Sequence, residues 1–333
     1  MFNLKCMIMK TLVKLFFFMT VVGFITGCNK TENLIIDDSQ YLKSAPVVNP
    51  DTPGLDQERW ITMKDMDITV HYRIIGKGPI DMVFIPGWTN PLTVYTKQFD
   101  YFRDKARCIY VDLPGQGVSD APSPATPINP DAEGPQYTME MMAKAVYTII
   151  KKEGLHHFVA VGFSMGPTVW SEFERIYPGM IEKLVSIDGG IEPWPTDPVE
   201  WQARYDAREA TYLAQLDWDM ATKQYLAGIL VPPGSPEDLI DFVNYFYDYP
   251  TDILANIYYY ADAENANELV EWNIPILCFF SDPNISMDYV NLIYPGNIFY
   301  AFPGGGHVIH WVFHEEINPI IWDFIKDRPG VKY

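Results

Sequence analysis

Short apolar runs alternate with stretches of helical periodicity over most of the 333 residues. The clearest runs are residues 80–85, 159–161, 183–188, 275–280 and 298–302. Runs of this length, bounded by turn residues, are typical of buried strands. Because helical segments separate them, the pattern predicts an α/β fold with a mostly parallel, doubly wound sheet.

One of these runs leads into the segment Gly162-Phe163-Ser164-Met165-Gly166, and helical periodicity follows. A serine hydroxyl becomes a useful nucleophile when a sharp strand-to-helix turn exposes it above a sheet, where a base can reach it. Glycines two positions before and after the serine give that turn its clearance, and Pro167 suits the first helical turn. The segment therefore predicts a nucleophile elbow with Ser164 at its apex.

Two further motifs precede this turn. Residues 80–88 run from a strand into Pro86-Gly87-Trp88, and residues 112–120 read Asp-Leu-Pro-Gly-Gln-Gly-Val-Ser-Asp. Together with the elbow, they resemble the α/β-hydrolase family from about Gln57 to the C-terminus. The resemblance implies an eight-stranded, mostly parallel sheet, a helical cap inserted after strand six, and a serine, histidine and acid triad.

The base that Ser164 needs is expected on the loop after the last strand. Gly304, Gly305 and Gly306 precede His307 there, and the segment resembles the Gly-x-Gly-His turn of the family. A histidine on this loop can take the hydroxyl proton and return it to the leaving group. His310 and His314 are expected to have packing or surface roles, and His71, His156 and His157 precede the elbow, where the family order does not place the base.

The acid that orients the histidine has several candidates. After strand seven the chain reads Ser281-Asp282-Pro283-Asn284, so the usual acid position holds Asn284, and Asp282 comes two residues early. Asp188, at the end of strand six, stands where the haloalkane-dehalogenase branch and some relatives carry their acid. We favour Asp188 over Asp282, and Asp288 or a dyad without an acid remains as a third alternative.

An acyl transfer also needs donors for the oxyanion, and two backbone N–H groups fit this role. One belongs to Met165, after the nucleophile, and the other to Trp88, after Pro86-Gly87. No Cys-x-x-Cys pair and no glycine-rich phosphate loop is present, and the sequence is taken to imply neither a metal nor another cofactor.

About eighty residues between strands six and seven interrupt the sheet pattern. They read as helices with breaks at Pro232-Pro233-Gly234 and at Pro250, and they are rich in aromatic residues such as Trp194, Trp218 and Tyr258. Most of these aromatics are expected to pack the helices on the core, and the rest to line the site. An aromatic-lined site favours a small uncharged or hydrophobic substrate.

The N-terminus carries Lys5, Lys10 and Lys14, then an apolar run that ends Ile25-Thr26-Gly27-Cys28. This segment resembles a bacterial lipoprotein signal, which implies lipidation of Cys28 and a location in the bacterial cell envelope. The formal net charge of −19 would become −22 without residues 1–27. Such an acidic chain repels phosphate backbones, so nucleic acid is not an expected partner, and contact with the membrane is expected only through the lipid.

Five segments follow from these observations. They are a signal peptide (1–27), a polar tether (28–56), the first part of the core (57–190), a helical cap (191–273) and the second part of the core (274–333). Cys108 and Cys278 lie in strands that are not expected to be neighbours, so both are predicted to be buried thiols.

A serine hydrolase of carboxylic esters or lactones is the leading functional hypothesis. C–C hydrolases, haloperoxidases and lyases use the same fold and triad and remain alternatives, as does a surface lipoprotein that binds a ligand without catalysis. A dehalogenase or an epoxide hydrolase is disfavoured, because those relatives carry an aspartate where this chain has Ser164.

Overall fold

The computed structural model describes residues 56–129, 131–235, 237–245, 248–262 and 270–326. All of them belong to the compact unit that spans residues 48–333. The predicted signal peptide, Cys28 and the predicted tether up to residue 55 lie outside the described residues, so lipidation and a location in the cell envelope remain predictions. Within the described ranges, no helix has the length and apolar character needed to cross a bilayer.

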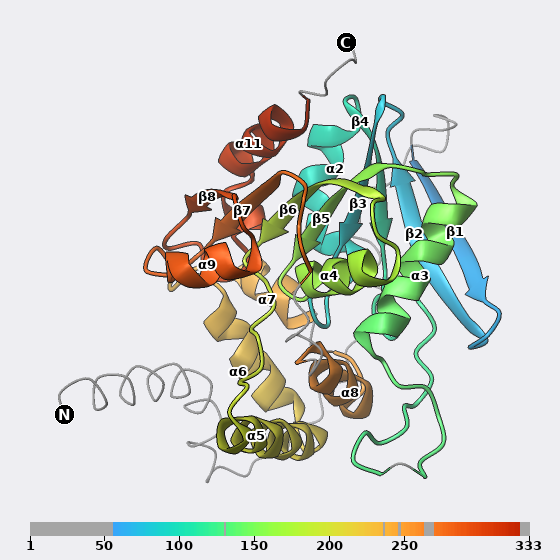
Figure 1. The fold of residues 1–333 in the computed structure, drawn as a ribbon, viewed down its shortest axis with the longest axis vertical. Helices are drawn as coiled ribbons and strands as arrows, with labels where there is room; N and C mark the ends of the chain where they lie inside the picture. Colours follow the sequence, from blue (N-terminus) through green and yellow to red (C-terminus); the bar gives the residue numbers. More distant parts are fainter. Residues whose placement is uncertain (1–55, 130, 236, 246–247, 263–269, 327–333) are drawn as a thin grey trace. The chain divides into compact units, whose positions relative to one another are not determined.

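The described residues form an eight-stranded sheet in the order β1-β2-β4-β3-β5-β6-β7-β8 (Figure 1). The strands are β1 (Asp56–Met63), β2 (Ile68–Ile75), β3 (Ile80–Ile85), β4 (Ala106–Val111), β5 (Phe158–Phe163), β6 (Ile181–Ile187), β7 (Ile276–Phe280) and β8 (Ile298–Ala301). β2 pairs antiparallel with β1 and β4, and all other neighbours are parallel. The predicted fold class is therefore confirmed.

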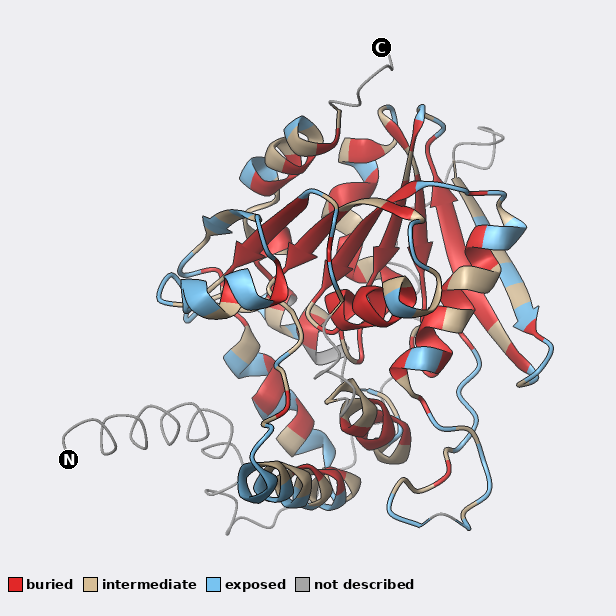
Figure 2. Ribbon diagram, in the orientation of Figure 1, coloured by how far each residue is buried: buried red, intermediate tan, exposed pale blue. Residues whose placement is uncertain are grey.

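Helices cover both faces of this sheet (Figure 1). One face carries α3 (Met139–Lys152), α4 (Gly166–Ile176) and α9 (Met287–Ile293), and the other carries η2 (Leu92–Tyr95), α2 (Thr96–Phe102), α10 (Ile309–Val312) and α11 (His314–Lys326). Successive side chains of a strand point to opposite faces of the sheet, so each strand contributes to a hydrophobic core on both faces. In β3, Val83 and Ile85 face one side and Met82 and Phe84 the other. The central strands are accordingly buried along their length (Figure 2).

In the described part of the chain, four helices lie between β6 and β7, and we call them the inserted helices. They are α5 (Pro198–Leu216), α6 (Met220–Leu230), α7 (Glu237–Tyr245) and α8 (Thr251–Ala261). Asp197 and Asp219 cap α5 and α6 by accepting backbone N–H groups of the first turn. Helix α5 packs on α8 through Tyr212 and Tyr259, whose ring centroids are 5.8 Å apart.

The two cysteines of the described core are free and buried, as predicted. Cys108 lies in β4 and Cys278 in β7, with three strands between them. Burial raises the pKa of Cys108 to about 12 and also raises the pKa of Cys278, so both stay protonated thiols near neutral pH.

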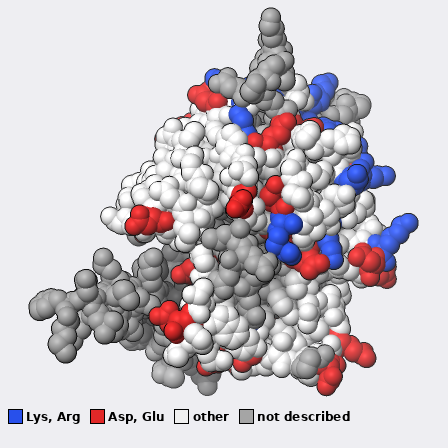
Figure 3. All heavy atoms as spheres, in the orientation of Figure 1, with Lys and Arg blue, Asp and Glu red and all other residues white. Residues whose placement is uncertain are grey.

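Charged side chains are unevenly distributed over the surface. On the face shown in Figure 3, Lys and Arg gather on the side of β1 and α3, and much of the remaining surface is uncharged.

Candidate active site

Ser164 lies at the apex of the turn between β5 and α4. Its φ is +56°, a left-handed conformation that a serine seldom adopts. The flanking glycines are required by close contacts: a Cβ on Gly162 would lie 2.6 Å from the Pro167 nitrogen, and one on Gly166 would lie 2.5 Å from the Ile85 oxygen. The turn therefore has the tight geometry that the motif predicts, with Ser164 half-buried.

The ends of three neighbouring strands hold this turn and Asp188 in place. The Ser164 N–H donates to the Ile187 carbonyl (2.9 Å), and the Asp188 N–H donates to the Phe279 carbonyl (2.7 Å). Asp188 also has a positive φ, +47°. Strained backbone of this kind persists only where the surroundings fix it, and it gathers at functional sites.

His307 joins Ser164 to Asp188. The structure places its Nε2 2.8 Å from Ser164 Oγ and its Nδ1 2.7 Å from Asp188 Oδ2. The loop after β8 carries the imidazole, and the His307 N–H donates to the carbonyl of Leu230 at the end of α6 (2.7 Å). The ring also packs on Phe163, with centroids 4.8 Å apart. The histidine is thus held by the core and by the inserted helices.

The Asp188 carboxylate accepts hydrogen bonds on both oxygens. The Ser281 N–H donates to Oδ1 (2.7 Å), the Ser281 hydroxyl donates to Oδ2 (2.9 Å), and His307 Nδ1 also reaches Oδ2. An ionised carboxylate can only accept, so Nδ1 of His307 carries the proton in this network. Nε2 is then free to accept from the Ser164 hydroxyl.

The other candidate acids are not brought to His307. Asp282 is exposed, and its Oδ1 accepts the Asn284 N–H (2.8 Å) in a local turn. Asp288 is exposed in the first turn of α9. Among the three candidate acids, the geometry therefore joins Asp188 alone to the histidine.

The remaining histidines lie outside this hydrogen-bonded chain. His310 is fully buried, and its Nε2 lies 3.2 Å from the Val94 carbonyl. Burial lowers the pKa of His310 to about 3, so this ring stays neutral near neutral pH. His314 Nδ1 donates to the Trp311 carbonyl (3.0 Å), and His156 and His157 are exposed.

The predicted oxyanion donors belong to Met165, which follows Ser164, and to Trp88, which follows Gly87 beside the serine. Met165 precedes α4 directly, and N–H groups at a helix N-terminus point away from the helix toward an incoming negative charge. Trp88 lies in the turn Gly87–Asn90, which the Asn90 N–H closes onto the Gly87 carbonyl (3.2 Å). Thr89 has a φ of +63°, as the third position of a type II turn requires.

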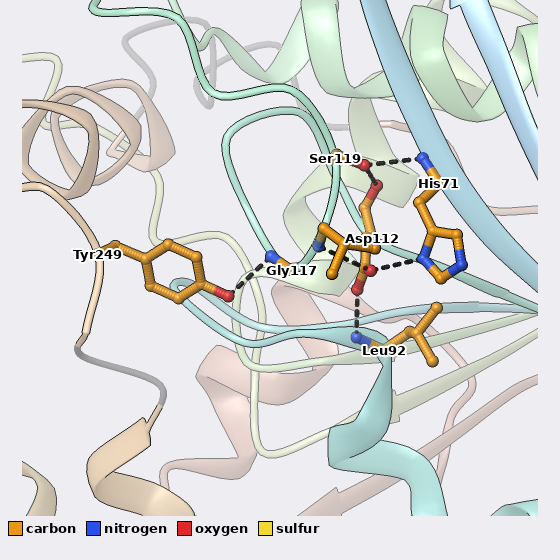
Figure 4. A network of polar contacts seen from close by, with 7 residues as sticks. His71, Leu92, Asp112, Gly117, Ser119 and Tyr249 are labelled. Atoms are coloured by element: carbon orange, nitrogen blue, oxygen red, sulfur yellow. Dashed lines mark hydrogen bonds and ion pairs between the residues drawn. The ribbon is translucent and has the colours of Figure 1, made fainter. Parts of the chain in front are cut away.

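A buried polar network fixes the far end of this turn (Figure 4). Asp112, 2% exposed, accepts from the Leu92 N–H (2.6 Å) with one oxygen, and from His71 Nδ1 (2.8 Å) and the Val118 N–H (3.1 Å) with the other. Ser119 donates to the Asp112 carbonyl and accepts from the His71 N–H. The carboxylate thus ties the strand carrying His71 to the loop that follows β3.

Substituting Asp112 by asparagine is expected to lower the free energy of unfolding by about 2–3 kcal/mol, because an NH₂ group then faces N–H donors in a buried site. Asp120→Asn is the matched control in the same loop. Asp120 is exposed, and among the described residues its carboxylate accepts one hydrogen bond, from the Thr69 N–H, so a loss below about 1 kcal/mol is expected. Urea denaturation of both variants measures this, and equal losses would contradict the prediction.

The inserted helices contact the site through aromatic residues and backbone groups. Trp88 Nε1 donates to the Leu254 carbonyl of α8 (2.9 Å). The centroid of its ring lies 4.9 Å from that of Tyr258 and 6.2 Å from that of Trp218. The Tyr249 hydroxyl accepts the Gly117 N–H (2.7 Å; Figure 4). Within the described residues, no three His, Cys, Asp or Glu side chains are placed to hold a metal ion.

Some residues of this site carried no recognisable signal in the sequence. Ser281, which holds Asp188, comes from another strand end, and its contact depends on the pairing of β6 with β7. The contact of His71 with Asp112 needs the order β2-β4, since Tyr72 pairs with Val111. The sheet order would have revealed both contacts, but the chain order does not.

Comparison with known proteins identifies the fold family of this chain. The sequence profile of the alpha/beta hydrolase fold matches residues 82–313. The chain is 28% identical over 191 residues to Protein PHYLLO, chloroplastic, of Arabidopsis thaliana, of which it spans only 10%. It is 22% identical over 296 residues to epoxide hydrolase 3 of Mus musculus, covering 80% of this chain and 77% of that protein.

Solved structures show the same fold. An esterase from Exiguobacterium antarcticum superimposes with a TM-score of 0.67 at 17% identity, over 80% of this chain and 99% of the esterase. A likeness at this identity concerns the fold, so the chemistry has to be argued from the residues of the site.

Proposed function

The chain belongs to the alpha/beta hydrolase fold family, and within this family of hydrolases we propose that it cleaves carboxylic esters or lactones through an acyl-enzyme at Ser164. The observation that carries the proposal is the hydrogen-bonded chain from Ser164 Oγ through His307 to Asp188. This order of nucleophile, base and orienting acid is what serine acyl transfer requires.

In acylation, Ser164 Oγ attacks the carbonyl carbon while its proton moves to His307 Nε2. The tetrahedral intermediate then collapses, the alkoxy group leaves, and it takes that proton as the alcohol. Water attacks the acyl-enzyme next, giving one proton to His307, and the acid leaves as Ser164 regains its hydrogen. Asp188 stabilises the imidazolium throughout and keeps its negative charge.

The backbone N–H groups of Trp88 and Met165 are proposed to bind the oxyanion of both intermediates. Loss of one such donor costs about 3 kcal/mol of transition-state stabilisation. We further propose that the inserted helices form the cap over this site. Trp218 and Tyr258, which lie against Trp88, then give the acyl side of the pocket an aromatic wall suited to uncharged or hydrophobic groups.

Epoxide opening is the competing activity, given the similarity to epoxide hydrolase 3 of Mus musculus. A carboxylate that opens an epoxide forms an ester, which water can then cleave. A serine that opened an epoxide would form an alkyl ether, which a histidine-activated water does not cleave, so the enzyme would stop after one turnover. Ser164 therefore favours acyl substrates.

Labelling with a fluorophosphonate probe tests the proposal. We expect one label per chain, on Ser164, and none in Ser164→Ala. p-Nitrophenyl esters of graded chain length, lactones and styrene oxide then define the substrate class. Folded protein that neither takes the label nor turns over any of these compounds would contradict a serine hydrolase and favour a protein that only binds ligands.

A further inference from the structure

Asn90 lies beside the proposed nucleophile. It is the last residue of the turn Gly87–Asn90 and is only 6% exposed. A Cβ built on Gly87 would lie 2.8 Å from Asn90 Oδ1 and also 2.8 Å from Ser164 Cβ. The carboxamide and the serine side chain therefore both lie next to the same glycine, together with Phe163 Cδ1 at 3.3 Å from the built Cβ.

Within the described residues, no hydrogen bond is found for the Asn90 side chain. Other buried amides of the core are bonded: Asn256 accepts from the Tyr137 N–H and donates to the Ala125 carbonyl, and Asn318 donates to the Lys97 carbonyl. Buried polar groups without a partner are rare in proteins and call for an explanation. For Asn90, the position beside Ser164 provides such an explanation.

Gln116 is a second buried amide without a partner among the described residues, but its position differs. Both polar atoms of its carboxamide are fully enclosed, so no substrate atom can reach them. Asn90 keeps a small accessible surface and lies next to Ser164.

A carboxamide offers two N–H donors and one carbonyl acceptor. Since neither end of the Asn90 amide is held, a half-turn about its last bond exchanges them at little cost, and either can be presented to a ligand. Attack by Ser164 converts the substrate carbonyl into a tetrahedral carbon with two further oxygens, the oxyanion and the leaving alkoxy oxygen. Both are acceptors close to Ser164.

We propose that Asn90 is a substrate-contacting residue whose NH₂ group donates a hydrogen bond to an oxygen of the carbon that Ser164 attacks. This inference rests on the proposed function and adds a side-chain donor to the backbone donors of Trp88 and Met165. A donor at this place acts mainly in the transition state, so its removal affects kcat more than KM.

Three variants test the inference: Asn90→Ala, Asn90→Asp and, as a control, Asn273→Ala on an exposed residue. We expect Asn90→Ala to lower kcat for a p-nitrophenyl ester by about 10- to 1,000-fold with KM changed less than threefold. Its affinity for a trifluoromethyl ketone, which forms an oxyanion on the serine, should fall by a similar factor. Asn90→Asp, of equal size, should be slower still, because a carboxylate cannot donate and repels the oxyanion. Asn273→Ala should match the wild type.

Thermal unfolding accompanies these measurements, since a merely structural role would lower the melting temperature without changing the affinity for the ketone. The inference is overturned if folded Asn90→Ala keeps kcat within twofold, or if its ketone affinity equals that of the wild type. Should Asn90→Ala fail to fold, the same criteria apply to Asn90→Asp. Wild-type protein that takes no fluorophosphonate label would instead refute the proposed function, so the two failures are distinguishable.

Discussion

Alanine at His307 is expected to lower kcat/KM for the best ester substrate by about ten-thousand-fold or more. The imidazole is the one base within hydrogen-bonding distance of Ser164 Oγ among the described residues, at 2.8 Å. Without it, the hydroxyl keeps its proton and the leaving alkoxide receives none. Steady-state kinetics measures the loss, and circular dichroism shows that the fold is retained.

His314→Ala is the matched control for this substitution. His314 is half-buried at the start of α11, and among the described residues its ring bonds the Trp311 carbonyl alone, so kcat/KM should stay within about threefold of the wild type. His310 is a poorer control, because its ring is fully buried against Phe163, and alanine there would leave a cavity. If His314→Ala were inactive and His307→Ala active, the assignment of the base would be wrong.

The second large effect is expected at Asp188, where asparagine should lower kcat by about ten-thousand-fold. Its oxygen can still accept from Ser281, but its NH₂ group then faces His307 Nδ1. That contact favours the tautomer with the proton on Nε2, which cannot accept from the Ser164 hydroxyl. Initial rates at saturating ester measure the change.

Asp282→Asn provides the comparison for Asp188→Asn. Asp282 is exposed and caps a local turn, so its variant should keep kcat within about twofold of the wild type. Equal and small losses in both variants would show that neither carboxylate orients the histidine, and the site would then work as a dyad of Ser164 and His307.

Local sequence signals located the elbow and the histidine loop. Gly162 and Gly166 are needed within one short turn, and the backbone contacts that exclude a Cβ arise from residues a few positions away or from the adjacent strand. Apolar runs likewise predicted the strands closely: residues 275–280 and 298–302 became β7 (Ile276–Phe280) and β8 (Ile298–Ala301). Such features depend on nearby residues, so the sequence order carries them.

The partners of these residues depend on contacts between distant segments. Asp188 and Asp282 both lie at strand ends near the histidine loop, and the pairing of β6 with β7 brings Asp188 to His307 while Asp282 closes a turn at the surface. The contact of Asp112 with His71, and the position of Asn90 and Ser164 beside the same Gly87, likewise bring together residues separated by 41 and 74 positions.

The sequence by itself therefore determined the fold class, the strand positions and the tight turn that carries Ser164, because each follows from periodicity or from steric demands within a few residues. Only the tertiary structure decided which carboxylate meets the histidine and which amide lies beside the serine. These contacts depend on which strands lie next to each other in the sheet. The order of the strands along the chain is compatible with several sheet orders, so the contacts are fixed only when the sheet forms.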